Sequence, residues 1–176
     1  MLKVGDFLPE FTLQSEHGPV SLKNLLGRRF VLYFYPRDDT PGCTVEACEF
    51  RDNLPKFDQI SVPVYGVSAD DMASHAKFAK KHGLNFTLLS DPEHKFIESM
   101  GFWVEKNNYG KKYMGIQRST FVIARNGQVE QVWEKVKPEG HAEEVFKWLG
   151  SSQAEDREDE MEYRTEAPKP KKPAKK

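Results

Sequence analysis

The segment Phe30-Val31-Leu32-Tyr33-Phe34-Tyr35 limits the possible folds of this 176-residue chain more than any other segment. It is rich in β-branched and aromatic residues, and no charged residue interrupts it. A strand with one face in water alternates between apolar and polar residues, whereas a continuous apolar run is typical of a central strand covered on both faces. We therefore expect an α/β protein in which helices flank a central sheet.

The remainder of the first 150 residues alternates between strand and helix patterns. Further strands are predicted at residues 11–14, 19–22, 62–68 and 86–89, and helices at residues 44–53, 70–82, 93–100 and 139–149. Asn126-Gly127 is a strong hairpin turn signal and joins two predicted strands, residues 119–124 and 128–134. Residues 102–116, which contain glycine and several aromatic residues, are expected to form a loop. This order of elements indicates a mixed sheet.

The chain has two cysteines, Cys43 and Cys48, and both follow the apolar run closely. Pro41-Gly42 ends the strand, and a helix is predicted from Thr44 onwards. Cys43 is therefore expected at a helix N-terminus, where unpaired N–H groups and the helix dipole favour an anion. A thiol in such a position ionises more readily, and the thiolate is the reactive form. The pattern favours cysteine redox chemistry.

The spacing of Cys43 and Cys48 is poor for a disulfide within a helix. Five positions along an α-helix rotate a side chain by about 500° and place the two Cα atoms about 8.6 Å apart, beyond the roughly 7 Å that a disulfide tolerates. If the two cysteines pair, the helix must first unwind, which suits a catalytic cycle better than a permanent link. The alternative is two unrelated cysteines, with Cys48 packed as a small apolar residue. A metal site is disfavoured because no second pair of Cys or His follows.

Composition and charge exclude several other classes of function. The net charge of −1 gives no general attraction to nucleic acid. No apolar stretch approaches the roughly 20 residues of a membrane span, and the N-terminus lacks the apolar region of a secretory signal. We therefore expect a cytoplasmic protein with reduced thiols and no membrane association.

The composition changes near residue 151, so the expected organisation is a domain at residues 1–150 and a tail at residues 151–176. The tail is mostly acidic up to Glu166 and rich in Pro and Lys after it. Such a segment is expected to be disordered. It could serve as an electrostatic arm for an anionic partner, but its acidic and basic blocks adjoin, which favours a solvated appendage.

Residues 35–44 read Tyr-Pro-Arg-Asp-Asp-Thr-Pro-Gly-Cys-Thr and carry the spacing Pro-x-x-x-Thr-x-x-Cys. Together with Cys48, this segment resembles the peroxiredoxin family and, within it, the peroxiredoxin Q group, also called bacterioferritin comigratory protein. The resemblance extends over residues 1–149 and includes residues 85–91 and 101–121. It implies a thioredoxin-like fold and a thiol peroxidase that reduces hydrogen peroxide and organic hydroperoxides in antioxidant defence, without metal, haem or flavin.

The resemblance also implies a role for each cysteine. Cys43 would be the peroxidatic cysteine, which attacks the peroxide and becomes a sulfenic acid. Cys48 would be the resolving cysteine, which condenses with Cys43 into an intramolecular disulfide that thioredoxin then reduces. These steps belong to the reversible part of cysteine oxidation. Because the resolving cysteine lies in the same chain, a monomer is expected.

Three further residues match the active site of the family. Thr40 would bond the sulfur and the peroxide through its hydroxyl, although an N-cap role explains a threonine there equally well. Pro36 would shield the site, although a proline after a strand is also a common stop signal. Arg118 would stabilise the thiolate and the departing oxygen; without the resemblance it reads as a solvated arginine at a strand end.

The other polar candidates carry weaker signals. His75 and His82 lie seven residues apart on one predicted helix, which is typical of a solvated stripe, and Asp38 and Asp39 read as turn residues. Two rival functions stay open on the residues alone. A thioredoxin-type dithiol oxidoreductase would need Cys-x-x-Cys, and here four residues separate the cysteines. A binding protein that recruits partners through its tail would leave both cysteines without a role.

Overall fold

The computed structural model of the chain describes residues 2–151. The predicted tail therefore lies outside the described residues, apart from Ser151. The chain divides into two compact units, Met1–Glu143 and Glu144–Lys176. The first unit contains all of the strands described below, and a last helix runs over residues 141–151, close to the predicted 139–149.

A mixed sheet of seven strands forms the centre of the first unit, in the order β2-β1-β5-β4-β3-β8-β9. The bounds of its strands are β1 (Thr12–Ser15), β2 (Gly18–Ser21), β3 (Phe30–Phe34), β4 (Val64–Ser68), β5 (Thr87–Ser90), β8 (Ser119–Ile123) and β9 (Val129–Glu134). Strand β4 pairs in parallel with both β3 and β5, whereas β8 pairs antiparallel with β3. The predicted mixed sheet is confirmed.

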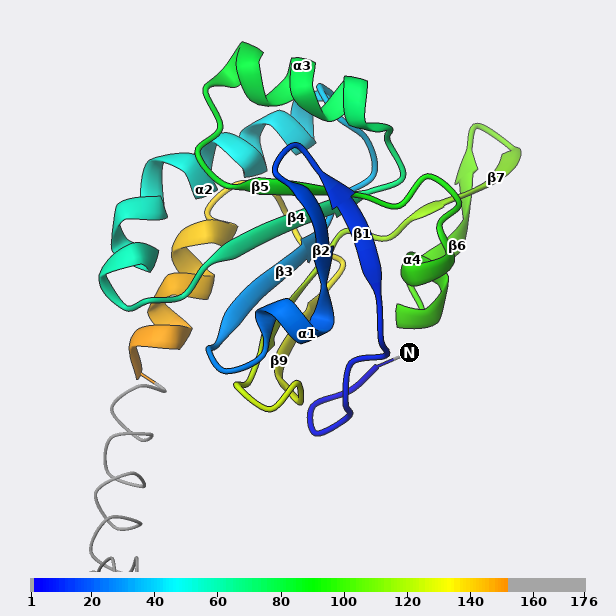
Figure 1. Cartoon of the computed structure of the whole chain (residues 1–176). Coiled ribbons are helices and arrows are strands. Elements are labelled where there is room, and N and C mark those ends of the chain that lie inside the picture. The colour runs from blue at the N-terminus through cyan, green and yellow to red at the C-terminus, as the bar shows by residue number, and fades with distance from the viewer. Residues whose placement is uncertain (1, 152–176) are drawn as a thin grey trace, which may run out of the picture. The chain divides into compact units, whose positions relative to one another are not determined.

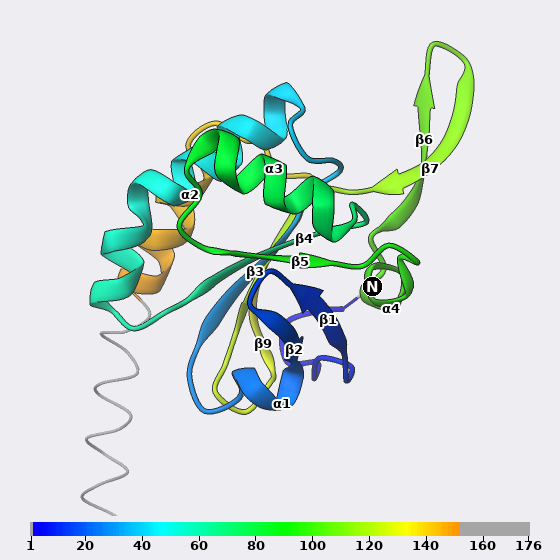
Figure 2. The same ribbon diagram turned by 45° about the horizontal axis from the view of Figure 1, so that its top comes forward.

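Strand β3 is buried on both faces, as its continuous apolar sequence predicts. The helices are α1 (Leu22–Leu25), α2 (Pro41–Gln59), α3 (Met72–His82) and α4 (Lys95–Met100). On one face of β3, the ring of Tyr33 stacks on Phe50 of α2 with centroids 4.7 Å apart. On the other face, the ring centroid of Phe34 lies 5.8 Å from that of Phe96 in α4. Figures 1 and 2 show α2 and α3 together on one side of the sheet.

Gly66 in β4 makes room for the aromatic packing above the sheet. It is the direct neighbour of Tyr33 across the β3–β4 pair. A Cβ atom at Gly66 would come within 2.9 Å of the Tyr33 ring and of Leu88, closer than packed atoms approach in a protein interior. The glycine therefore allows the Tyr33 ring to lie flat between the sheet and α2.

Two local predictions were wrong. Helix α2 was expected over residues 44–53 but begins at Pro41 and ends at Gln59, with Pro55 in its interior. Proline suits the first helical position because no N–H is needed there. The expected loop 102–116 is instead an antiparallel hairpin of β6 (Trp103–Asn108) and β7 (Lys111–Ile116), which projects from the sheet in Figures 1 and 2. Its turn residues Tyr109 and Gly110 both have positive φ angles, as a tight two-residue hairpin turn requires.

The other boundaries agree with the sequence predictions to within two residues. Strands β8 and β9 form the predicted hairpin, and Gly127 in its turn has a φ angle of 90°. Helix α3 ends at His82 and is capped by Gly83, which adopts the left-handed conformation of a helix C-cap. Among the described residues, no helix has the length and apolar character needed to cross a membrane.

Candidate active site

Cys43 lies in the first turn of α2 and is 2 % exposed. Thr40 is the N-cap residue, and the N–H of Thr44 donates the first helical hydrogen bond to the Thr40 carbonyl at 2.8 Å. The backbone N–H groups of this turn lack helical partners, and the positive end of the helix dipole lies here. The helix start therefore places the Cys43 sulfur in a region of positive electrostatic potential.

Arg118 binds the sulfur of Cys43 from a different part of the fold. Its Nη2 donates to Cys43 Sγ at 3.2 Å. The contact follows from the sheet register, because Ser119 at the start of β8 pairs with Phe34 at the end of β3, just before the loop that leads into α2. Antiparallel pairing thus brings together two residues that are 75 positions apart in the chain.

Glu46 completes a triplet of hydrogen-bonded side chains with Cys43 and Arg118, and sequence analysis did not identify its role. Arg118 Nη1 donates to Glu46 Oε1 at 2.8 Å, and the Glu46 side chain is 1 % exposed. Burial raises the pKa of Glu46 to about 7, although Arg118 acts in the opposite direction. Its position three residues after Cys43 on the same helix face was the signal that could have revealed it. Glu46 orients the guanidinium towards the sulfur.

Gly42 contributes to the site through its lack of a side chain. A Cβ atom at Gly42 would lie 3.2 Å from Arg118 Nη2 and 3.3 Å from Pro138 Cγ. A larger residue would therefore press on the guanidinium that holds Cys43. The glycine, first interpreted as a turn residue, also gives Arg118 access to the sulfur.

Thr40 and Pro36 lie in the loop before α2, and both are partly buried. The Thr40 hydroxyl donates to the Arg37 carbonyl at 2.9 Å and makes no side-chain cap bond to the helix. Thr40 thus has the backbone conformation of an N-cap, while its hydroxyl closes a turn within the loop. No hydrogen bond from Thr40 to Cys43 occurs in the described part of the chain.

Cys48 lies within α2, one helical turn and a half from Cys43, and is partly buried. Both thiols are free. Since α2 is continuous from Pro41 to Gln59, the helical spacing of about 8.6 Å between the Cα atoms applies. The two sulfurs cannot join until this part of the helix unwinds.

The comparisons with known proteins agree with this geometry. Residues 4–132 match the model of the AhpC/TSA family. The chain belongs to this family. The peroxiredoxin Bcp of Bacillus subtilis is 45% identical over 149 residues, which cover 84% of this chain and 95% of that protein. A putative peroxiredoxin bcp of Coxiella burnetii is 48% identical over 145 residues, 82% of this chain and 96% of that protein.

Solved structures assign this AhpC/TSA protein to the peroxiredoxin Q group and confirm the thioredoxin-like fold. A cysteine-to-serine mutant of Xylella fastidiosa PrxQ superposes with a TM-score of 0.82 at 36% identity, over 87% of this chain and 98% of that chain. A cysteine-to-serine mutant of Xanthomonas campestris peroxiredoxin Q superposes with a TM-score of 0.78 at 39% identity, over 86% of this chain and 98% of that chain. The chain is thus a peroxiredoxin, and peroxiredoxins are peroxidases.

Two further groups lie in the electrostatic field of the peroxiredoxin site. Burial, followed by the charges of Glu46 and Cys43, raises the pKa of Tyr33, whose hydroxyl has no hydrogen-bond partner among the described residues. Burial, followed by the charge of Arg118, lowers the pKa of Lys106, while Cys43 acts in the opposite direction. Lys106, in the middle of strand β6, is therefore a second cation whose charge acts on the site together with Arg118.

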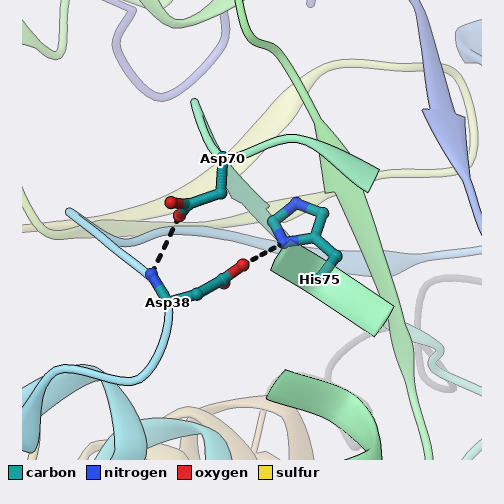
Figure 3. A group of neighbouring side chains, drawn as sticks. All are labelled: Asp38, Asp70 and His75. Atoms are coloured by element: carbon teal, nitrogen blue, oxygen red, sulfur yellow. Dashed lines mark hydrogen bonds and ion pairs between the residues drawn. The ribbon is translucent and has the colours of Figure 1, made fainter. Parts of the chain in front are cut away.

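Beside the peroxiredoxin site, Asp38 and His75 form a buried pair that contradicts one prediction. His75 was expected on a solvated stripe, but its side chain is 1 % exposed and its Nδ1 lies 2.7 Å from Asp38 Oδ2. Asp38 lies in a turn, as predicted, and its side chain is 3 % exposed. Figure 3 shows the pair with Asp70, which comes from the loop after β4. Helix spacing alone cannot identify a buried histidine, because its partner lies 37 residues away.

Asp38, Asp70 and His75 offer ligand atoms within 4.8 Å of one another, a spacing that could suit a metal ion. The second ring nitrogen of His75, Nε2, lies 3.0 Å from the Leu89 carbonyl. Both imidazole nitrogens therefore already bond to protein oxygens, whereas a metal requires a free lone pair. The cluster fits a network of hydrogen bonds better than a metal site.

Proposed function

We propose that this peroxiredoxin is a thiol peroxidase that reduces hydrogen peroxide and organic hydroperoxides through Cys43. The observation that carries the proposal is the 3.2 Å hydrogen bond from Arg118 to a sulfur at the start of a helix. A related Xanthomonas campestris bacterioferritin comigratory protein, 38% identical, is described by its alkyl peroxide reduction activity. Its similarity supports organic hydroperoxides as substrates.

In the first step, the Cys43 thiolate attacks the terminal oxygen of the hydroperoxide. The O–O bond breaks, the sulfur keeps the OH group as a sulfenic acid, and the departing alkoxide or hydroxide takes a proton to give alcohol or water. Arg118 stabilises both the thiolate and the negative charge that develops on the departing oxygen. We assign Thr40 and Pro36 to positioning and shielding the peroxide.

In the second step, Cys48 attacks the sulfenic sulfur, and the oxygen leaves as water while the disulfide forms. The first turns of α2 must unwind for this step, as the helical spacing requires. A dithiol reductant of the thioredoxin class then returns two electrons by thiol–disulfide exchange. We infer that the enzyme works as a monomer in the cytoplasm, where thiols are kept reduced.

Peroxide consumption coupled to thioredoxin, thioredoxin reductase and NADPH tests the proposal. Cys43→Ser should abolish turnover, whereas Cys48→Ser should react once with peroxide and then recycle poorly. Mass spectrometry after one equivalent of peroxide should show the loss of two hydrogens in the wild-type protein and the gain of one oxygen in Cys48→Ser. Full activity in Cys43→Ser would contradict the assignment.

We further propose that residues 1–150 suffice for this activity. All of the residues in the mechanism lie between Pro36 and Arg118. Deletion of residues 151–176 should leave the rate of peroxide consumption nearly unchanged in the same coupled assay. A large loss of activity would show that the segment contributes to catalysis or to reductant binding.

A further inference from the structure

The loop between β3 and α2 is fixed by one buried side chain. Between Pro36 and Thr40, Asp38 is buried while Arg37 and Asp39 are exposed, and the two end residues are only partly buried. This loop leads directly into the first turn of α2, which carries Cys43. The position of the helix start therefore depends strongly on how Asp38 is held.

Both carboxylate oxygens of Asp38 accept hydrogen bonds from other elements. The Tyr35 hydroxyl donates to Oδ1 at 2.5 Å, and the Ser74 hydroxyl donates to Oδ2 at 2.8 Å. His75 Nδ1 lies 2.7 Å from Oδ2. The carboxylate thus links the loop to the end of β3 and to two neighbouring residues of α3.

The backbone of Asp38 is fixed as well. Its N–H donates to Asp70 Oδ2 at 2.8 Å, and the same oxygen accepts a hydrogen bond from the Ser68 hydroxyl at 2.6 Å. Figure 3 shows Asp38 between the carboxylate of Asp70 and the ring of His75. The backbone N–H of Asp38 is therefore held by the segment at the end of β4, and its carboxylate is held by α3. These bonds leave the loop little freedom around Asp38.

The protonation of His75 follows from its two contacts. A backbone carbonyl can only accept a hydrogen bond, so Nε2, which faces the Leu89 carbonyl, carries a proton. Burial alone would lower the pKa of His75, but the hydrogen bond and the charge of Asp38 outweigh it and raise the pKa. The two side chains form a buried hydrogen-bonded pair, and loss of either partner leaves a buried polar group of the other without its bond.

We propose that the buried His75–Asp38 pair positions the loop at residues 36–40, and with it Cys43, for attack on the peroxide. Neither residue bonds to the sulfur, so both act as positioning residues. The inference rests on the proposed peroxidase function. Because the loop must move when the start of α2 unwinds, the same pair also opposes unwinding and therefore slows disulfide formation.

Opposite effects on the two chemical steps distinguish this role from a general loss of stability. His75→Phe removes both hydrogen bonds of the ring. It should lower the second-order rate constant for the reaction of Cys43 with hydrogen peroxide about ten- to hundred-fold, as expected for a misplaced nucleophile. It should also raise the first-order rate constant of disulfide formation. Both constants can be measured by stopped-flow tryptophan fluorescence with one equivalent of peroxide and no reductant.

Two further variants serve as matched controls. His75→Asn places an amide nitrogen near the position of Nδ1 and so keeps a donor to Asp38; it should restore most of the first-step rate. His82→Phe makes the same substitution on the same helix, where His82 pairs with the exposed Asp39 and contributes little. It should leave both rate constants unchanged.

The outcomes separate the two proposals. A wild-type protein whose Cys43 does not react with peroxide would contradict the proposed function itself. If the wild type reacts with peroxide, two results in His75→Phe would contradict the positioning role. One is an unchanged rate of the first step, and the other is an equal slowing of both steps. If His75→Phe fails to fold, Asp38→Asn, which keeps the size of the side chain, should show the same opposite changes, and their absence would overturn the inference.

Discussion

Substitution of Glu46 by glutamine should change how the stability of this peroxiredoxin depends on pH. Burial raises the pKa of Glu46 from 4.5 to about 7 in the folded state. At about 1.4 kcal/mol for each pKa unit, this difference corresponds to about 3 kcal/mol of unfolding free energy. Glutamine preserves the shape of the side chain and removes the titration.

The sign of the effect follows from the two states. Below pH 4.5, Glu46 is protonated in both the folded and the unfolded chain. Its ionisation then costs the folded state nothing, and the stability contributed by the protonated carboxyl is fully present. As the pH rises from 4.5 to about 7, the unfolded chain ionises while the buried carboxyl stays protonated, so this contribution is lost. Relative to the wild type, Glu46→Gln should therefore gain up to about 3 kcal/mol between pH 4.5 and pH 8.

Urea unfolding of the reduced proteins at several pH values measures this gain. Comparison of the variant with the wild type cancels the titration of all the other groups. A constant difference between Glu46→Gln and the wild type would refute the reasoning from burial.

Three further predictions concern the site and the core. Arg118→Met should slow the reaction of Cys43 with hydrogen peroxide about ten- to hundred-fold, since hydrogen bonds to charged groups contribute about 1.5–3 kcal/mol; an unchanged stopped-flow rate would exclude a role in this step. Oxidation should raise hydrogen exchange over residues 44–49 of α2, but not beyond Phe50, which is fully buried; full protection of the oxidised helix would contradict the unwinding. Gly66→Ala should lower the free energy of unfolding by about 1–3 kcal/mol through overpacking, measured by urea denaturation.

The elements that sequence predicted well are those with local signals. The apolar run of β3, the Asn126-Gly127 turn and the Gly83 cap each depend on residues close in the chain. The β6–β7 hairpin was missed because its turn places Tyr109 at a positive φ angle, which is uncommon outside glycine, asparagine and aspartate. Local patterns thus determined most strand and helix positions to within two residues.

The active site depended more on contacts between distant segments. Cys43 was identified from its own neighbourhood, but the position of Arg118 follows from the pairing of β8 with β3. From sequence, Glu46 is only an acidic residue near the start of a predicted helix. Its burial results from tertiary packing and could not be predicted from its neighbours in the chain. His75 was misjudged for the same reason, because the partner that stabilises it, Asp38, comes from another loop.

The two partners of the Arg118–Cys43 hydrogen bond would behave differently in the proposed cycle. Arg118 adjoins the central sheet, whereas Cys43 lies at a helix start that would unwind when the proposed disulfide forms. Oxidation would therefore carry the sulfur away from Arg118, and the guanidinium would stay where the sulfur returns. After reduction, rewinding of α2 would restore the nucleophile without any rearrangement of the sheet. Reactivity towards peroxide would in this way be coupled to the winding of the first turns of α2.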